Sequence, residues 1–331
     1  MHLWIDKSAW VSSKACAKAN RLTIDKIERI AVIKHAALGD LLLTRPLFIT
    51  LREYFPKSKI TLNVIDNYLD GIPYDLIDDI YIIKKDESSF YHNYITYRKF
   101  GHYDLLFDIT ATTRSFWISY IANAKLKIGY KHKGVERLVY DAAVPRSDYK
   151  FEAETFLDQL LILGLSYKWP LEFNFDYEPL QREKPYILYF PTASTMQKCW
   201  SLQKYYHLID TLCRDLSQFD HIILRGVSRW EKEICNNIKD KIGNINNILI
   251  LDGGNETPKI VKGAKLVLSN DTGIRNMAIA AYTPSVGIFV NTLPFRYFPR
   301  FGNHQVIFRI DGSEPSVIQV KEAVYRSLSL K

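Results

Sequence analysis

Short apolar runs alternate with amphipathic segments from residue 29 onward. Such runs are typical of strands buried on both faces of a parallel sheet, and the segments between them have the period of surface helices. The runs predict strands at residues 30–34, 59–65, 80–83, 105–108, 186–190, 221–225, 248–251, 266–269 and 286–289. The helical periods predict helices at residues 40–55, 115–122, 152–163, 202–216, 231–238 and 277–281.

The alternation occurs twice, on either side of a polar, proline-flanked stretch at residues 170–185. Strands and helices at this spacing predict two doubly wound α/β domains, and a chain of 331 residues is long enough for both. We expect an N-terminal extension at 1–29, a first domain at 30–172, a second at 173–312 and a C-terminal helix at 313–331.

The extension interleaves Leu3, Trp4, Trp10 and Val11 with lysines. One interpretation is an amphipathic helix docked on the protein. The other is a helix lying in the interface of an anionic bilayer, where Trp and Lys together are favourable.

Composition narrows the class of protein. The chain is 47% hydrophobic and 24% charged, which excludes a disordered or coiled-coil protein. Its net charge of +8 divides evenly between residues 1–170 and 171–331, which favours an anionic substrate or membrane surface over a nucleic-acid groove. The cysteines form no CxxC motif, so we expect free thiols. No apolar run is long enough to span a membrane, and Asp6 and Lys7 interrupt any signal peptide. We therefore expect a cytoplasmic protein.

Ligands of doubly wound sheets bind beyond the carboxyl ends of the strands, so the loops there carry the chemistry. The first such loop, residues 35–40, ends in Gly39 and Asp40, and Asp40 is either a helix N-cap or a general base. Pro46 leaves open whether the regular helix begins at Asp40 or only after Thr44. A second loop contains Asp108 and Arg114, which suit either capping and ion pairing or contact with a phosphorylated acceptor.

Two loops of the second domain are suited to phosphate groups. Residues 191–200 supply the hydroxyls of Ser194 and Thr195 and the cation of Lys198. At residues 266–273 a strand runs into Asp271-Thr272-Gly273 and then into a helix, whose N-terminus favours anions. The chain lacks both GxGxxG and the P-loop pattern, so neither standard nucleotide fingerprint is present.

Three motifs together resemble glycosyltransferase family 9, the bacterial lipopolysaccharide heptosyltransferases. They are the xxLGD loop at Asp40, Pro191-x-Ala193-Ser194-xxx-Lys198-x-Trp200, and Gly263-Ala264-Lys265 followed by Ser269-Asn270-Asp271-Thr272-Gly273. The resemblance covers about residues 30–310 and implies a GT-B fold, with two Rossmann-like domains facing across a cleft. It also implies that the acceptor binds the first domain, the donor binds the second, and the C-terminal helix packs back on the first.

The resemblance implies a role for each matching residue. Asp40 is the catalytic base of a single, inverting displacement that needs no metal, and the chain has no Asp-x-Asp motif. Acceptor binding falls to Gly39, Asp108 and Arg114. Donor binding falls to Ser194, Thr195, Lys198, Glu231, Asp271, Thr272, Gly273 and Asn276. Glu231 matches the ribose-contacting position, although a solvated helix face is its simpler interpretation.

The chain departs from the family at two places. Asn276 stands where the family commonly has His, and Thr110-Ala111 replaces the usual Gln-Gly. Asn can donate a hydrogen bond but cannot carry charge, so the contact with the donor is expected to differ.

The resemblance implies transfer of heptose from ADP-heptose to the inner core of lipopolysaccharide or lipooligosaccharide. The partners are then a nucleotide-sugar donor, a lipid-linked phosphorylated oligosaccharide acceptor and the cytoplasmic face of the inner membrane, with no nucleic acid and no cofactor. The alternatives are a GT-B transferase of another nucleotide sugar, a sugar-nucleotide epimerase of the same fold, and a basic, non-catalytic binding module.

Overall fold

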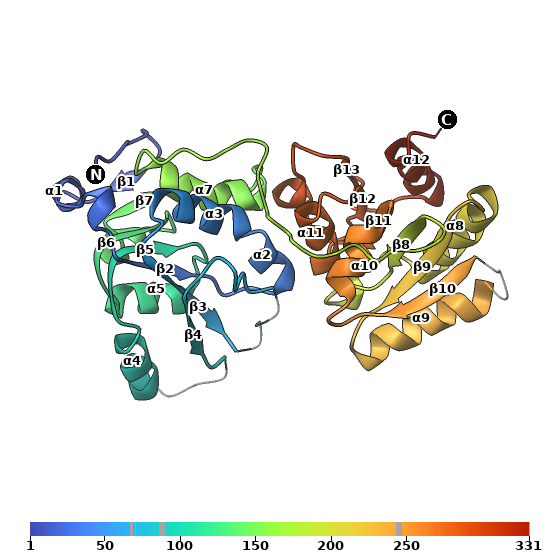
Figure 1. Cartoon of the computed structure of the whole chain (residues 1–331), viewed down its shortest axis with the longest axis horizontal. Coiled ribbons are helices and arrows are strands. Elements are labelled where there is room, and N and C mark those ends of the chain that lie inside the picture. The colour runs from blue at the N-terminus through green and yellow to red at the C-terminus, as the bar shows by residue number, and fades with distance from the viewer. Residues whose placement is uncertain (67–68, 70, 86–89, 243–246, 331) are drawn as a thin grey trace. The chain divides into compact units, whose positions relative to one another are not determined.

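The computed structural model describes residues 1–66, 69, 71–85, 90–242 and 247–330. They form two compact units, Met1–Phe173 and Asn174–Lys331 (Figure 1). The division falls inside residues 170–185, which lie outside every helix and strand up to the start of β8 at Tyr186. In each unit, strands alternate with helices and build a largely parallel sheet, as the apolar runs predict.

The sheet of the first unit has the order β1-β7-β6-β5-β2-β3-β4. Every neighbouring pair is parallel except β1 and β7. The strands are β1 Trp10–Val11, β2 Arg29–Ile33, β3 Lys59–Ile65, β4 Asp79–Ile83, β5 His102–Asp108, β6 Asn123–Tyr130 and β7 Ala142–Val144. The central strands β2 and β5 are almost wholly buried because helices cover both faces of the sheet.

Helices of the first unit lie on opposite sides of this sheet: α3 and α7 on one face, α4 and α5 on the other (Figure 1). Tyr97 of α4 and Ile118 of α5 pack on Ile33 and Leu106 of the central strands. The helices are α1 Ala15–Asn20, α2 Leu38–Leu42, α3 Arg45–Tyr54, α4 Phe90–Arg98, α5 Thr113–Ile121, α6 Glu136–Val139 and α7 Glu152–Leu161, with a 3-10 turn at Ile24–Lys26.

The N-terminal extension differs from both interpretations of its sequence. Its apolar residues do not lie on one amphipathic helix: Trp10 pairs with Ala143 as an edge strand, and the helix α1 has only six residues. Leu3 is buried, and the ammonium group of Met1 donates to the carbonyl of Ala19 at 2.8 Å. Pairing with the exposed edge of β7 satisfies backbone groups that a surface helix would have left at that edge.

The sheet of the second unit is entirely parallel, with the order β10-β9-β8-β11-β12-β13. Its strands are β8 Tyr186–Phe190, β9 Asp220–Arg225, β10 Ile248–Asp252, β11 Leu266–Asn270, β12 Ser285–Ile288 and β13 His304–Ile307. Its helices are α8 Leu202–Asp215, α9 Arg229–Ile242, α10 Thr257–Gly263, α11 Gly273–Ala280 and α12 Val317–Ser327, with 3-10 turns at Met196–Lys198 and Phe295–Tyr297. The C-terminal helix α12, expected to pack on the first domain, buries Val320 and Val324 in the core of the second unit.

Both sheets reverse their strand order at one point. In the first unit the chain runs from β2 to β3 in one direction, and β5 returns on the other side of β2. In the second unit β8 lies between β9 and β11 in the same way. Ligands of doubly wound sheets bind beyond the strand ends at such switch points. The loops after β2 and β5 are therefore the candidate site of the first unit, and the loops after β8 and β11 are that of the second. These are the four loops that the sequence singles out.

Candidate functional site

Asp40 lies inside the first turn of the short helix α2. The N-cap of this helix is Ala37, so the N-cap interpretation of Asp40 is wrong. The side chain is half-buried, and its backbone N–H donates to the carbonyl of Ala37 at 3.1 Å. A carboxylate in the first helical turn is favoured by the helix dipole.

The loop that carries Asp40 is tied to the neighbouring strands. The backbone N–H of His35 donates to the Thr110 hydroxyl at 2.9 Å, and that hydroxyl donates to the Ile33 carbonyl at 3.0 Å. Nε2 of His35 lies 2.9 Å from Oδ1 of Asn63, whose amide group donates to Tyr81. Burial lowers the pKa of His35, so the ring is a neutral donor that fixes the loop after β2.

Asp108 is wholly buried at the end of β5. One carboxylate oxygen accepts from the backbone N–H groups of Thr110 and Ala111, and the other accepts from the Tyr140 hydroxyl at 2.6 Å. The structure therefore gives this carboxylate a positioning role in the loop, in place of the direct acceptor contact that the resemblance implied. Ala111 has φ of 59°, the left-handed conformation that favours the glycine of the family pattern.

Gly39 and Arg114 lie in the helices that follow β2 and β5, at the same edge of the sheet. Gly39 is buried within α2. Arg114 is half-buried in the first turn of α5 and donates to the carbonyl of Lys85 at 2.5 Å. Because β2 and β5 are paired, with Ile33 opposite Asp108, the two loops emerge side by side.

Sequence reasoning missed a buried charged cluster beneath the Asp40 loop. Lys34 follows β2 directly, and its ammonium lies 3.8 Å from the Glu152 carboxylate and 4.3 Å from the centre of the Phe156 ring. Arg146 donates to the same carboxylate at 2.5 Å. Lys34 and Glu152 are both buried. Only an acidic residue on the buried face of the predicted helix at 152–163 could have signalled this cluster.

Asn270 ties together the two ends of the loop after β8 in the second unit. Asn270, at the end of β11, accepts from the Trp200 N–H at 2.9 Å and donates to the carbonyls of Pro191 and Thr192. Its buried side chain therefore holds both ends of the loop after β8. The motif contains Asn270, but sequence reasoning gave it no role.

Lys198 and Asp271 meet across the switch point. Their Nζ and Oδ2 atoms are 3.3 Å apart, and the same carboxylate oxygen accepts from the Thr292 hydroxyl at 2.8 Å. Thr272 is the N-cap of α11, where its hydroxyl oxygen accepts from the N–H of Ile274, and Gly273 is the first helical residue. The structure thus brings a cation and a helix N-terminus together, an arrangement that can bind a diphosphate.

Three more of the residues predicted to bind donor differ in their exposure to solvent. Ser194 and Thr195 are exposed on the loop after β8. Asn276 is buried in α11.

Glu231 is not on a solvated helix face, so that interpretation is wrong. Its carboxylate accepts from the Thr192 hydroxyl at 3.3 Å and from the Ser228 N–H at 3.1 Å. A Cβ atom at Gly226 would lie 2.3 Å from this carboxylate, so the glycine makes room for it. The geometry holds Glu231 beside the loop after β8, where a donor's hydroxyl groups can reach it.

Arg275 is a second residue that sequence reasoning missed. It is fully buried, lies 5.3 Å from the Phe289 ring centre and donates to the carbonyl of Tyr297. Burial lowers its pKa to about 10, so it stays charged at neutral pH. It fixes the segment after β12, which also supplies Thr292 to Asp271.

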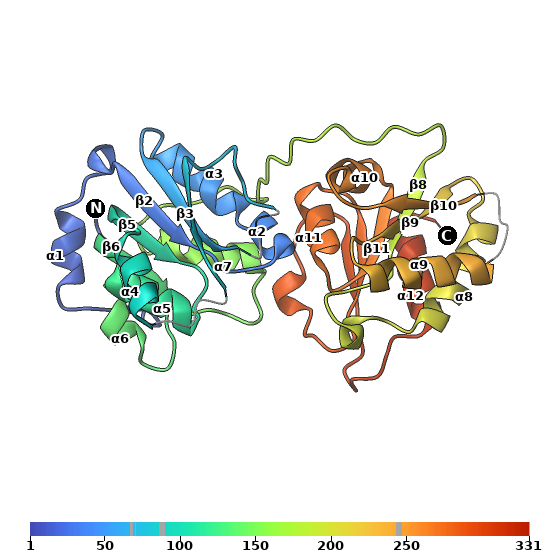
Figure 2. The ribbon, with the colours of Figure 1, turned by 90° about the horizontal axis from the view of Figure 1, so that it is seen from below.

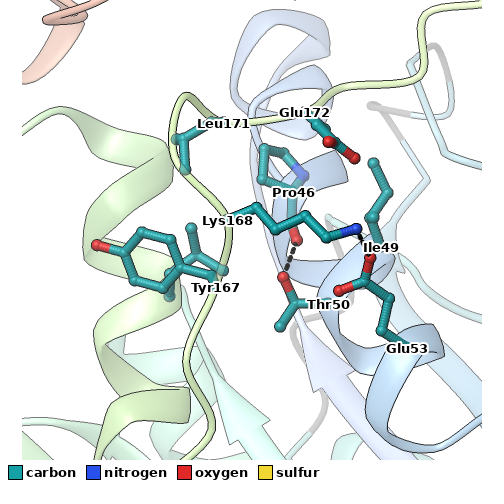
Figure 3. A pocket seen from close by; sticks show the side chains of 9 residues that line it. Pro46, Ile49, Thr50, Glu53, Tyr167, Lys168, Leu171 and Glu172 are labelled. Carbon is teal, nitrogen blue, oxygen red and sulfur yellow. Dashed lines mark hydrogen bonds and ion pairs between the residues drawn. The ribbon is translucent and has the colours of Figure 1, made fainter.

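A small hollow lies between α3, α7 and the segment 167–172 (Figure 3). Lys168 and Glu53 form an ion pair of 2.6 Å across its mouth. The hollow offers about 10 Å³ to the centre of a water molecule, which is room for one water and for no sugar. Elsewhere, no three His, Cys, Asp or Glu side chains within the described ranges are grouped so that they could hold a metal ion.

Two Rossmann-like units with loops at their switch points form a GT-B fold, which this chain shares with solved heptosyltransferases. Residues 162–325 match the sequence profile of glycosyltransferase family 9 (heptosyltransferase). The chain is a glycosyltransferase, and the residues that match this family include most of its second unit.

Individual relatives agree with this assignment. Lipopolysaccharide heptosyltransferase 3 of Escherichia coli is 24% identical over 281 residues, or 76% of this chain and 80% of that protein. The family 9 glycosyl transferase from Veillonella parvula DSM 2008 has a TM-score of 0.77 at 19% identity, covering 93% of this chain and 99% of that one. E. coli heptosyltransferase WaaC with ADP-2-deoxy-2-fluoro heptose has a TM-score of 0.74 at 18% identity, covering 90% and 99%.

Proposed function

We propose that the protein transfers heptose from ADP-heptose to the inner core of lipopolysaccharide or lipooligosaccharide. The observation that carries the proposal is the Lys198–Asp271 pair beside the N-terminus of α11 at the switch point of the second unit, together with Glu231, which is bonded to Thr192 of the loop after β8. The relatives support the choice of sugar, because one is named a lipopolysaccharide heptosyltransferase and another was solved with an ADP-heptose analogue.

Asp40 acts as the general base in this proposal. It takes the proton from an acceptor hydroxyl while that oxygen attacks the anomeric carbon, and the ADP oxygen leaves with the bonding electron pair. A single displacement inverts the anomeric configuration and requires only one carboxylate. General base catalysis of this kind contributes roughly 10²- to 10⁴-fold to a rate.

Charge that develops on the departing diphosphate is stabilised without a metal. Lys198, the hydroxyls of Ser194 and Thr195, and the backbone at Thr272 and Gly273 supply positive charge and hydrogen-bond donors. Glu231 accepts hydrogen bonds from the ribose, and Asn276 contacts the donor in place of the family's His. Gly39 and Arg114 contact the acceptor, while Asp108 shapes the loop between them.

The lipid-linked acceptor places the reaction at the cytoplasmic face of the inner membrane, and we propose peripheral association there. No helix within the described residues is long and apolar enough to cross a bilayer.

Thermal-shift measurements with ADP-, UDP- and GDP-sugars test the donor, because a ligand at about 100 times its Kd stabilises the folded state by about 2.7 kcal/mol. We expect ADP-heptose to raise the melting temperature most. ADP release that requires a lipid-linked acceptor then identifies a transferase. Release without acceptor would indicate an epimerase, and no shift with any ADP-sugar would contradict the proposed donor.

A further inference from the structure

One face of the first unit combines exposed aromatic, apolar and basic side chains. The α5–α6 face, as we define it, consists of Trp117, Tyr120, Lys133, Arg137 and Leu138. Figure 2 shows α5 and α6 next to each other on this side of the unit, and the rings of Phe116 and His132 are 5.4 Å apart between them. The helix α5 begins directly after the loop that contains Asp108.

The apolar members of this face are exposed although their neighbours are buried. Trp117 is 47% exposed, Tyr120 57% and Leu138 78%. Phe116, Ile118 and Val139, which flank them in sequence, belong to the core. Exposed apolar side chains that lie together on a protein surface are typical of sites that bind another protein or a membrane. Tryptophan and leucine on two adjacent helices form such a patch.

No exposed carboxylate accompanies this patch in the described residues 92–140. The acidic side chains of that stretch, Asp104, Asp108 and Glu136, are all buried. Glu136 accepts from the N–H of His132 at 2.9 Å, and Asp104 accepts from the N–H groups of Glu28 and Arg29. Lys131, Lys133 and Arg137 are exposed, so the charged side chains that this stretch exposes beside α6 are basic.

We propose that the α5–α6 face docks on an anionic lipid bilayer. Tryptophan and tyrosine favour the headgroup level, where Leu138 would enter the acyl boundary and Lys133 and Arg137 would contact lipid phosphates. A nucleic acid would use the positive charge but would leave Leu138 without an apolar partner. The inference rests on the proposed function for the identity of the membrane and deepens it, because it names the surface that brings a lipid-linked acceptor to the loops of the first unit.

Vesicle co-sedimentation of the full-length protein tests this surface without donor or acceptor. Vesicles of equal parts phosphatidylglycerol and phosphatidylcholine are compared with vesicles of phosphatidylcholine alone. We expect binding to the anionic vesicles only, weakened about thirtyfold by the double variant Lys133→Gln/Arg137→Gln, since each basic residue near the surface contributes about fivefold. The pair Trp117→Ser/Leu138→Ser is expected to weaken binding as well.

Matched controls lie on the second unit. Lys239→Gln/Lys241→Gln removes two exposed charges from α9, and Ile318→Ser removes an exposed apolar side chain from α12. Both are expected to bind as the wild type does, and melting temperatures show that every variant is folded. Equal binding by folded face variants and wild type would overturn the proposal, as would preferential binding to duplex DNA. The vesicle assay contains no nucleotide sugar. Its result therefore still tests the α5–α6 face if ADP-heptose proves not to be the donor.

Discussion

Single residues in the loop after β5 show how the chain departs from the family pattern. Ala111 holds a left-handed backbone conformation at the position where the family pattern has glycine. The two hydrogen bonds from residues 110 and 111 to Asp108 keep the loop in this shape despite its cost. The departure from glycine therefore adds a conformational cost to this loop.

Ala111→Gly is expected to stabilise the protein by about 0.5–1 kcal/mol, because glycine adopts this conformation without the penalty of a Cβ atom. Chemical denaturation measures the change. Ala122→Gly serves as the control, since Ala122 has φ of −59° and should lose stability with glycine. Equal effects of the two substitutions would show that the backbone of residue 111 carries no strain.

Glu231→Gln is expected to raise the KM for the donor roughly tenfold or more, since a hydrogen bond to a charged group contributes about 1.5–3 kcal/mol. Glu233→Gln on the same helix is the control, because Glu233 is exposed and pairs only with Arg229 in the described structure. Steady-state kinetics with varied donor separate KM from kcat. An unchanged KM would remove Glu231 from the donor site.

At the scale of elements, the sequence predicts buried strands well and edges poorly. The strands 59–65 and 186–190 match β3 and β8 at both ends, because apolar residues buried on both faces leave a continuous run. The strand β6 is not among the predicted strands. Lys125 and Lys127 alternate with Leu126 and Ile128, so the segment contains no continuous apolar run. The helix expected at 40–55 is two helices, since the chain turns at Leu43 and Thr44 before Pro46.

The candidate site also has parts that the sequence predicts and parts that it does not. Loops after buried strands could be predicted. The strand order places the loops after β2 and β5 beside each other in the first unit, and those after β8 and β11 beside each other in the second. The buried ties that hold them, Asn270 and Arg275, could not be predicted, because a sequence does not tell which polar side chain turns inward.

Asn270→Ala is expected to destabilise the second unit by roughly 2–3 kcal/mol, because it leaves a buried N–H and a carbonyl without partners. The melting temperature should fall by several degrees and the KM for the donor should rise, since the loop after β8 loses its anchor. Asn236→Ala on the exposed side of α9 is the control. A normal melting temperature for Asn270→Ala would contradict the anchoring role.

Over the whole molecule, the net charge is equal in the two halves of the sequence, but the exposed charges are not evenly distributed. The even division of +8 concealed a stretch, residues 92–140, whose carboxylates are buried and whose basic groups on the α5–α6 face are exposed. Burial also acts on the histidines of the second unit. It lowers the pKa of His304 to about 3, with the nearby charge of Arg275 as a smaller cause, and it lowers the pKa of His221.

The stability of the protein is therefore expected to fall as the pH drops from about 6.5 toward 3. In this window the unfolded chain binds protons that the folded chain refuses, so acid favours unfolding by up to about 4 kcal/mol for one such group. Denaturation curves at several pH values measure the slope. His304→Asn should flatten it and His207→Asn, an exposed control, should not; identical slopes would show that His304 titrates normally.

The role of Asp40 as base on an ADP-heptose transferase is the central claim, and acceptor-dependent ADP release by Asp40→Asn tests it most directly. Asparagine keeps the shape of the side chain but cannot take a proton, so we predict a rate lower by roughly 10²- to 10⁴-fold. The thermal shift with ADP-heptose should persist, and Asp25→Asn, an exposed control, should react as the wild type does. Wild-type rates from folded, donor-binding Asp40→Asn would contradict the account.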